Sequence, residues 1–125
     1  MFEITNYPNF IKLNHKNGSS IIFKLDHIQC TSDIYIINDS YYFNILPEGS
    51  FLDQLKIWKT YFHSKCIFVN SDTHLRIKIP FRYKKFILNC NPYEFIQKNT
   101  NISLVISLVG ISFSSLQFKV LEIYK

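Results

Sequence analysis

The chain has 125 residues, of which 47% are hydrophobic and 18% are charged. This size and composition favour a single domain, residues 1–125, with one hydrophobic core, and they exclude a disordered tail. The longest nearly apolar run, Ile102–Phe113, has 12 residues. A bilayer-spanning helix needs about 20, so the run is too short to cross a membrane.

The composition also bears on origin and compartment. Phe, Ile, Lys, Asn and Tyr make up about half of the chain, and alanine is absent. A/T-rich codons specify these five residues, so we expect an A/T-rich genome such as that of a virus or a plasmid. The cysteines Cys30, Cys66 and Cys90 form an odd, sparse set that is typical of reduced thiols in a cytoplasmic, reducing compartment. The N-terminal residues predict no signal peptide.

The formal net charge of +5 is unevenly distributed. Residues 1–50 carry three lysines against five acids, whereas residues 51–125 carry eleven Lys and Arg residues against four acids. A basic half beside an acidic half favours a surface that binds a polyanion such as nucleic acid. The alternative is a lysine-rich surface that reflects codon bias alone.

The first half of the chain predicts two hairpins. Phe10–Lys16 alternates between apolar and polar residues, and Asn17-Gly18 follows it directly. Asn-Gly is the strongest short hairpin signal, so Ser20–Ile28 is the predicted return strand. A second hairpin is predicted from Ile34–Ile37 and Tyr41–Leu46, which flank the turn residues Asn38-Asp39-Ser40.

A single helix is predicted over Phe51–His63. Its apolar stripe includes Leu52, Leu55, either Trp58 or Lys59, and Phe62. Ser50 stands where an N-cap is expected, and Asp53 is a weak capping-box partner. Because Trp58 shares the helix stripe, we expect its indole in the core.

The second half predicts further strands. A third hairpin is expected from Cys66–Val69 and His74–Ile79 around the turn Asn70–Thr73. In its second strand Leu75, Ile77 and Ile79 face one way, and His74, Arg76 and Lys78 face the other.

A basic, aromatic segment comes next. Phe81–Asn89 is expected to form a loop or an edge strand, and Asn91-Pro92 a turn. Strands are predicted at Ile102–Val109 and Leu116–Tyr124, with a bend marked by Gly110 and Ser114-Ser115.

This order of strands, one helix and more strands predicts a mainly β fold. An OB-like decorated β-barrel with one central α-helix is the leading prediction, with the helix closing one end of the barrel after its third strand. An open α+β sheet is the alternative.

The segment Phe81–Phe86 interleaves cations with aromatic rings. Single-stranded nucleic acid requires both, because cations neutralise phosphates and rings stack on unpaired bases. Other strands offer similar side chains on their polar faces. The predicted nucleic-acid-binding residues are Lys24, Tyr35, Tyr42, Arg76, Lys78, Arg82, Tyr83, Lys84, Lys85 and Lys119. The alternative is an edge strand whose lysines prevent aggregation.

Catalysis and metal binding find little support. The acids are scattered, and three glycines leave no phosphate-binding loop. We therefore expect no enzyme and no cofactor. His63 and Cys66, with His74 and Cys90, form a weak zinc alternative. They lack the paired spacing of zinc ligands, so we predict no metal site.

The C-terminal segment Ile106–Lys125 (ISLVGISFSSLQFKVLEIYK) has an apolar strand, a glycine, a short turn and then aromatic-Lys-Val. It resembles the last two strands of small single-stranded DNA-binding proteins from A/T-rich viruses and virus-like linear plasmids of yeast. The resemblance implies an OB barrel, sequence-tolerant binding and a role in replication. Only Phe118 and Lys119 carry over by position. We expect no acidic C-terminal tail, which departs from many such proteins and leaves a tail-mediated partner contact in doubt.

We therefore predict a single-stranded DNA-binding protein of viral or plasmid DNA replication. The partner would be single-stranded nucleic acid and not a membrane. Homo-oligomers and replication proteins remain open as further partners. One alternative is a structural or protein-interaction module without nucleic acid. Another is a factor that binds double-stranded termini through Gln54, Lys56 and Lys59 on the helix.

Overall fold

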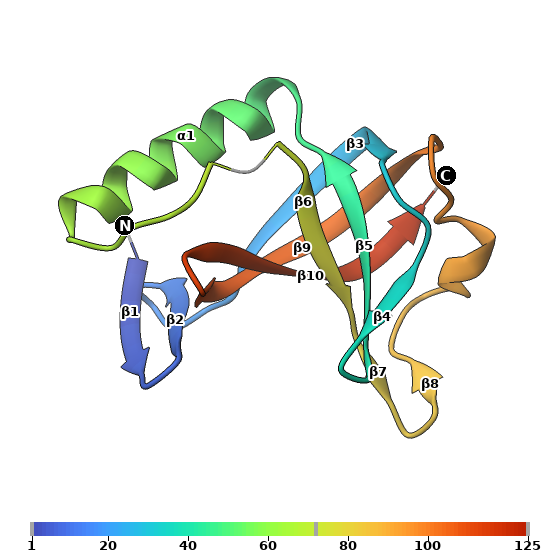
Figure 1. Ribbon diagram of the computed structural model, residues 1–125, viewed down its shortest axis with the longest axis horizontal. Coiled ribbons are helices and arrows are strands. Elements are labelled where there is room, and N and C mark those ends of the chain that lie inside the picture. Colours follow the sequence, from blue (N-terminus) through green and yellow to red (C-terminus); the bar gives the residue numbers. More distant parts are fainter. Residues whose placement is uncertain (1, 72, 125) are drawn as a thin grey trace.

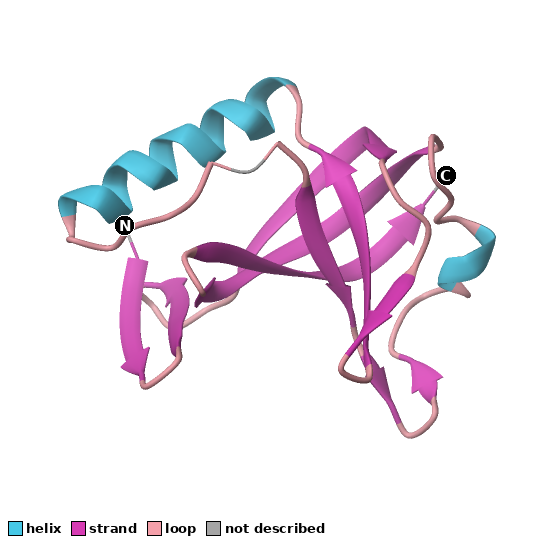
Figure 2. Ribbon diagram, in the orientation of Figure 1, coloured by secondary structure: helices cyan, strands magenta, loops and turns pink. Residues whose placement is uncertain are grey.

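Ten strands, one α-helix and one 3₁₀ helix form the computed structural model, which describes residues 2–71 and 73–124 (Figures 1 and 2). In chain order they are β1 (Phe2–Tyr7), β2 (Phe10–His15), β3 (Ile21–Cys30), β4 (Tyr35–Ile37), β5 (Ser40–Leu46), α1 (Gly49–Ser64), β6 (Leu75–Ile79), β7 (Phe81–Arg82), β8 (Lys85–Phe86), η1 (Pro92–Glu94), β9 (Asn101–Ser112) and β10 (Ser115–Tyr124). The predicted mainly β class is confirmed.

Five of these strands pair in a ring. β3 pairs with β9, β9 with β10, β10 with β6, β6 with β5, and β5 with β3. The β10–β6 pair is parallel, and the other four are antiparallel. The β3–β5 contact is short, with only Gln29 opposite Leu46 and Cys30 opposite Ile45. The sheet thus partly closes on itself.

The hydrophobic core fills the inside of this ring. Alternate residues of each strand point inward, because side chains in a strand alternate between its two faces. Fully buried examples are Phe43, Ile77, Leu104, Ile106 and Val120. The prediction that Leu75, Ile77 and Ile79 share one face is confirmed, and this face points inward, since all three are buried.

Helix α1 packs its aromatic stripe against the sheet. The Phe62 ring stacks on Phe2 of β1 at 5.3 Å between centroids, and Trp58 lies 5.0 Å from Phe23 of β3. Phe51 reaches Phe118 of β10 at 6.0 Å. Trp58 is only 3% exposed, so its predicted place in the core is confirmed.

The start of α1 differs from the prediction. Glu48, and not Ser50, is the N-cap residue, and it makes no side-chain capping bond. The helix follows β5, which is the second ring strand, whereas we expected it after the third. No helix in the described part of the chain has the length and apolar character needed to span a membrane.

The first predicted hairpin is wrong in its pairing. The turn forms at Asn17-Gly18, where Gly18 has φ 84° and its N–H donates to the His15 carbonyl at 2.8 Å. However, β2 pairs with β1 and β9, and β3 pairs with β9 and β5. The long strand β9 takes both: one of its edges pairs with β3 and then, at Gly110 and Ile111, with β2.

The second predicted hairpin is confirmed, and the third is wrong. β4 and β5 pair around Asn38 and Asp39, which both have positive φ. In contrast, Cys66–Val69 forms no strand, and residue 72 of the predicted turn lies outside the described residues. β6 pairs instead with β5 and β10, which occupy both of its edges. Strand β1 was not predicted.

The basic, aromatic segment forms a separate hairpin of β7 and β8. Its two-residue turn, Tyr83-Lys84, has φ of 54° and 62°, which is typical of a type I′ turn. The hairpin extends away from the ring (Figure 1). Near its base the Phe81 and Phe86 rings lie 5.0 Å apart and both pack on Tyr41.

Candidate nucleic-acid interface

One row of side chains crosses the outer face of four neighbouring strands. Tyr35 of β4 lies opposite Tyr42 of β5, and Tyr42 lies opposite Lys78 of β6. Lys78 in turn lies opposite Lys119 of β10. Residues opposite each other in a sheet share a face, so the ring brings four predicted residues from distant segments side by side. We call these four and Arg76 the outer row.

The aromatic half of the outer row is a stack capped by a cation. The Tyr35 and Tyr42 rings are 5.9 Å apart and 28° from parallel. The Arg76 guanidinium lies 4.9 Å from the Tyr42 centroid, a cation–π contact. The Tyr35 hydroxyl donates to Asn44 Oδ1 at 2.6 Å. Burial raises the pKa of Tyr35 despite the opposing charge of Arg76, so the phenol stays neutral and keeps donating.

The basic half of the outer row juxtaposes two like charges. Lys78 and Lys119 are both exposed and lie opposite each other on adjacent strands. Like charges directly opposite destabilise a sheet. Neither lysine makes an ion pair with a described residue. A bound anion would relieve this repulsion.

Two hollows lie along the outer row. The larger, about 440 Å³, is lined by Tyr42, Lys78, Arg82, Gln117 and Lys119 among others. The smaller, about 260 Å³, is lined by Tyr35, Asn44, His74, Arg76 and Gln117 among others. Gln117 belongs to both, and its Nε2 donates to the carbonyls of Ser112 and Ser115 at 3.4 and 3.3 Å. No described residue lining either hollow is acidic.

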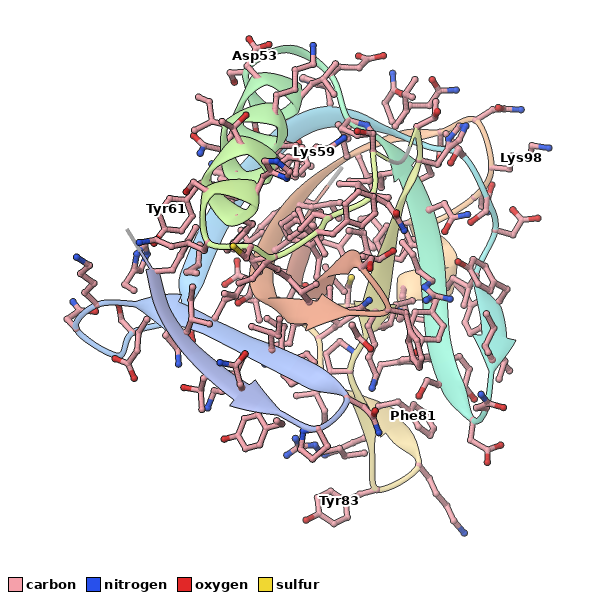
Figure 3. All side chains as sticks on the ribbon, turned by 60° about the vertical axis from the view of Figure 1, so that its left-hand side comes forward. Asp53, Lys59, Tyr61, Phe81, Tyr83 and Lys98 are labelled. Carbon is pink, nitrogen blue, oxygen red and sulfur yellow. The ribbon has the colours of Figure 1, made fainter. Side chains whose placement is uncertain are left out.

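The β7–β8 hairpin borders the larger hollow. Phe81 and Arg82 line it directly, whereas Tyr83 stands at the tip with 90% of its surface exposed (Figure 3). Lys84 shares the tip, and Lys85 pairs with Arg82. All four predicted residues of this segment are exposed, so they extend the basic face beyond the ring.

Lys24 does not join the others. It is exposed on β3 opposite Val105 of β9, so β9 separates it from β10 and Lys119. The two residues that the resemblance carried over, Phe118 and Lys119, lie in different environments. Phe118 is buried against Phe51 in the core, and Lys119 is exposed on the outer row.

Sequence reasoning missed several lining residues. Asn44 and Gln117 carry no charge or ring. Each lies two residues away from a residue of the outer row on its own strand, so the two-residue period of a strand could have predicted that it shares that face. Phe10 and Val109 line the larger hollow from β2 and β9. Only the pairing of β2 with β9 brings Phe10 there, and no local signal predicts it.

Two further findings bear on the site, one on metal ligands and one on similarity to known proteins. Among the described residues, no three His, Cys, Asp or Glu side chains come together as a metal site would require. No family model matches the sequence, and no curated protein and no solved structure matches the chain.

Proposed function

We propose that this protein binds single-stranded nucleic acid through the outer row and the β7–β8 hairpin, as a DNA-binding protein of viral or plasmid replication. The observation that carries the proposal is the Lys78–Lys119 pair beside the Arg76–Tyr42–Tyr35 stack. Two cations with no described acid to neutralise them suit phosphates. A capped aromatic stack at the same place suits unpaired bases.

The strand order supports an OB-like barrel as the scaffold. An OB fold is a five-stranded, partly open Greek-key barrel that binds oligonucleotides on its second and third strands. The ring here has five strands, and its second and third in chain order are β5 and β6. These two carry Tyr42, Arg76 and Lys78. The position of α1 after the second ring strand is the feature that departs from the expected barrel.

The chemistry favours single strands over duplex. Rings stack only on bases that are unpaired, and Tyr83 is fully available at the hairpin tip. The helix offers little for reading a major groove. Gln54 is half-buried, and Lys59 donates a hydrogen bond to Ser71.

A salt titration tests the proposal. Binding of a labelled single strand of about 12 nucleotides and of its duplex is measured by fluorescence anisotropy. The site variant is Lys78→Gln, Arg82→Gln and Lys119→Gln combined. The matched control, Lys16→Gln, Lys56→Gln and Lys98→Gln, removes the same charge from exposed positions elsewhere. Lys98 lies far from the hairpin tip in Figure 3.

We expect the wild type to prefer the single strand. Each lost phosphate contact lowers the log–log salt slope by about 0.7, so the site variant should lower it by about 2 and the control should leave it unchanged. Equal, weak binding to both forms, or the same loss in both variants, would contradict the proposal. Absence of any binding would favour the protein-interaction alternative.

A further inference from the structure

A third hollow, of about 760 Å³, adjoins the proposed interface. It lies between the β1–β2 hairpin, the loop after α1 and the β9–β10 turn, and its lining includes Tyr7, Asn9, Phe10, Lys65, Phe68 and Phe113. Phe10 also lines the 440 Å³ hollow, which shares Gln117 with the 260 Å³ hollow. The 440 Å³ hollow therefore shares one lining residue with each of the other two.

The third hollow has the same chemistry as the other two. Phe113 is 91% exposed and Phe68 is 64% exposed, and Lys65 stands in the lining with the amides of Asn6 and Asn9. No described residue lining any of the three hollows is acidic, and each hollow has at least one cation. The series is thus complementary to a polyanion that carries rings.

Turn geometry singles out two of the exposed rings. Tyr83 and Phe113 are the first residues of their two-residue hairpin turns, with φ of 54° and 50°. Left-handed turn positions favour Asn and Gly, and bulky residues are rare there. Neither turn needs a ring, and neither ring is buried. Backbone strain of this kind is concentrated at binding sites. Both exposed rings therefore indicate a ligand-binding surface.

We infer that the bound single strand continues past Phe10 into the third hollow, and this inference rests on the proposed function. There Phe113 and Phe68 stack on further bases, and Lys65 contacts a phosphate. The β1–β2 hairpin and the loop after α1 are therefore part of the binding surface, and the site is longer than the outer row alone. The occupant is the continuation of the same single strand.

A length series of oligothymidylates tests this inference. Strands of about 4 nucleotides report the outer row alone, and strands of about 12 report both parts. The test variant is Phe113→Asn with Phe68→Ser, in which Asn suits the left-handed turn and preserves folding. Phe113→Tyr keeps a ring and serves as the rescue. Tyr124→Ser is the matched control, because Tyr124 is exposed and lines none of the three hollows.

We expect the test variant to bind the long strand at least tenfold more weakly and the short strand as the wild type does. Phe113→Tyr and Tyr124→Ser should match the wild type at every length. Unchanged affinity at all lengths, as expected if a protein partner covers the hollow, would overturn the inference and leave the proposed function standing. An equal loss at both lengths would also overturn it. Failure of the wild type to bind any strand would overturn both.

Discussion

Gly110 is the residue whose small size decides how two strands meet. It lies within β9 opposite Lys12 of β2, and a Cβ there would collide with the Ile11 carbonyl oxygen and the Phe10 ring. β9 continues through this position, so the predicted bend is wrong at Gly110, and the chain turns instead at Phe113-Ser114, next to the predicted Ser114-Ser115. Because Gly110 has no side chain, β2 can come close to β9 at this position. No local pattern in the sequence distinguishes a glycine with this role from a glycine at a bend.

Gly110→Ala should therefore destabilise the protein. Overpacking of this kind costs about 1–3 kcal/mol, and it should appear as a lower urea midpoint. Gly18→Asn is the control, because Gly18 has φ 84° with open space around it, and Asn tolerates that conformation. Wild-type stability in Gly110→Ala would show that β2 can shift at no cost.

Cys30 links burial to pH. Burial raises the pKa of its thiol from 9.0 to about 11. As the pH rises above 9, the unfolded thiol ionises first, so the unfolded state binds fewer protons than the native state. Stability contributed by this group is therefore complete below pH 9 and declines between 9 and about 11, by at most about 1.4 kcal/mol per pH unit.

Urea unfolding at about pH 8 and about pH 10.5 measures this decline. In Cys30→Val the decline should be shallower than in the wild type, whatever the substitution does to stability at neutral pH. Cys66→Ser is the control, since Cys66 is exposed. Identical declines in all three proteins would mean that the Cys30 thiol does not titrate differently on unfolding.

At the scale of elements, a substitution at the tip of the β7–β8 hairpin should affect stability and single-strand binding differently. Tyr83 and Lys84 occupy a type I′ turn, in which Asn is favoured at the first position. Tyr83→Asn should therefore leave the melting temperature unchanged or slightly higher. Its affinity for single strands should fall about tenfold, since a stacked base contributes about 1–3 kcal/mol. Anisotropy and thermal unfolding of one preparation check both effects, and unchanged affinity would remove the tip from the site.

The elements also show what could be predicted from sequence. Alternation in Leu75–Ile79 correctly divided its residues between two faces, one of which is buried and one exposed, because the two-residue period of a strand is local. The Asn17-Gly18 turn was also predicted correctly, but its strands were paired wrongly. Which edge a strand joins depends on competition among all the strands, and β9 has an edge long enough for both β2 and β3.

At the scale of the whole molecule, the Lys78–Lys119 pair should lower the stability of the protein while it favours the binding of single strands. Lys78→Gln removes a like-charge pair, which should stabilise the protein by at most about 1 kcal/mol because both side chains are exposed, and it should weaken single-strand binding. Lys98→Gln should change neither. Urea unfolding at low salt and anisotropy measure the two effects, and the stabilisation should shrink in high salt as repulsion is screened. A change of the same sign in both would contradict a role for the pair in holding an anion.

By itself the sequence determined the strand-rich class, the single helix, the buried Trp58, and the kinds of side chain on each strand face. These follow from local periodicity and composition. Only the tertiary structure decided that Lys119 lies beside Lys78, that Lys24 lies elsewhere, and that Phe10 joins two hollows. The physical reason is that the partly closed ring fixes the neighbours of each strand through pairings between distant segments, and these pairings leave no local trace in the chain.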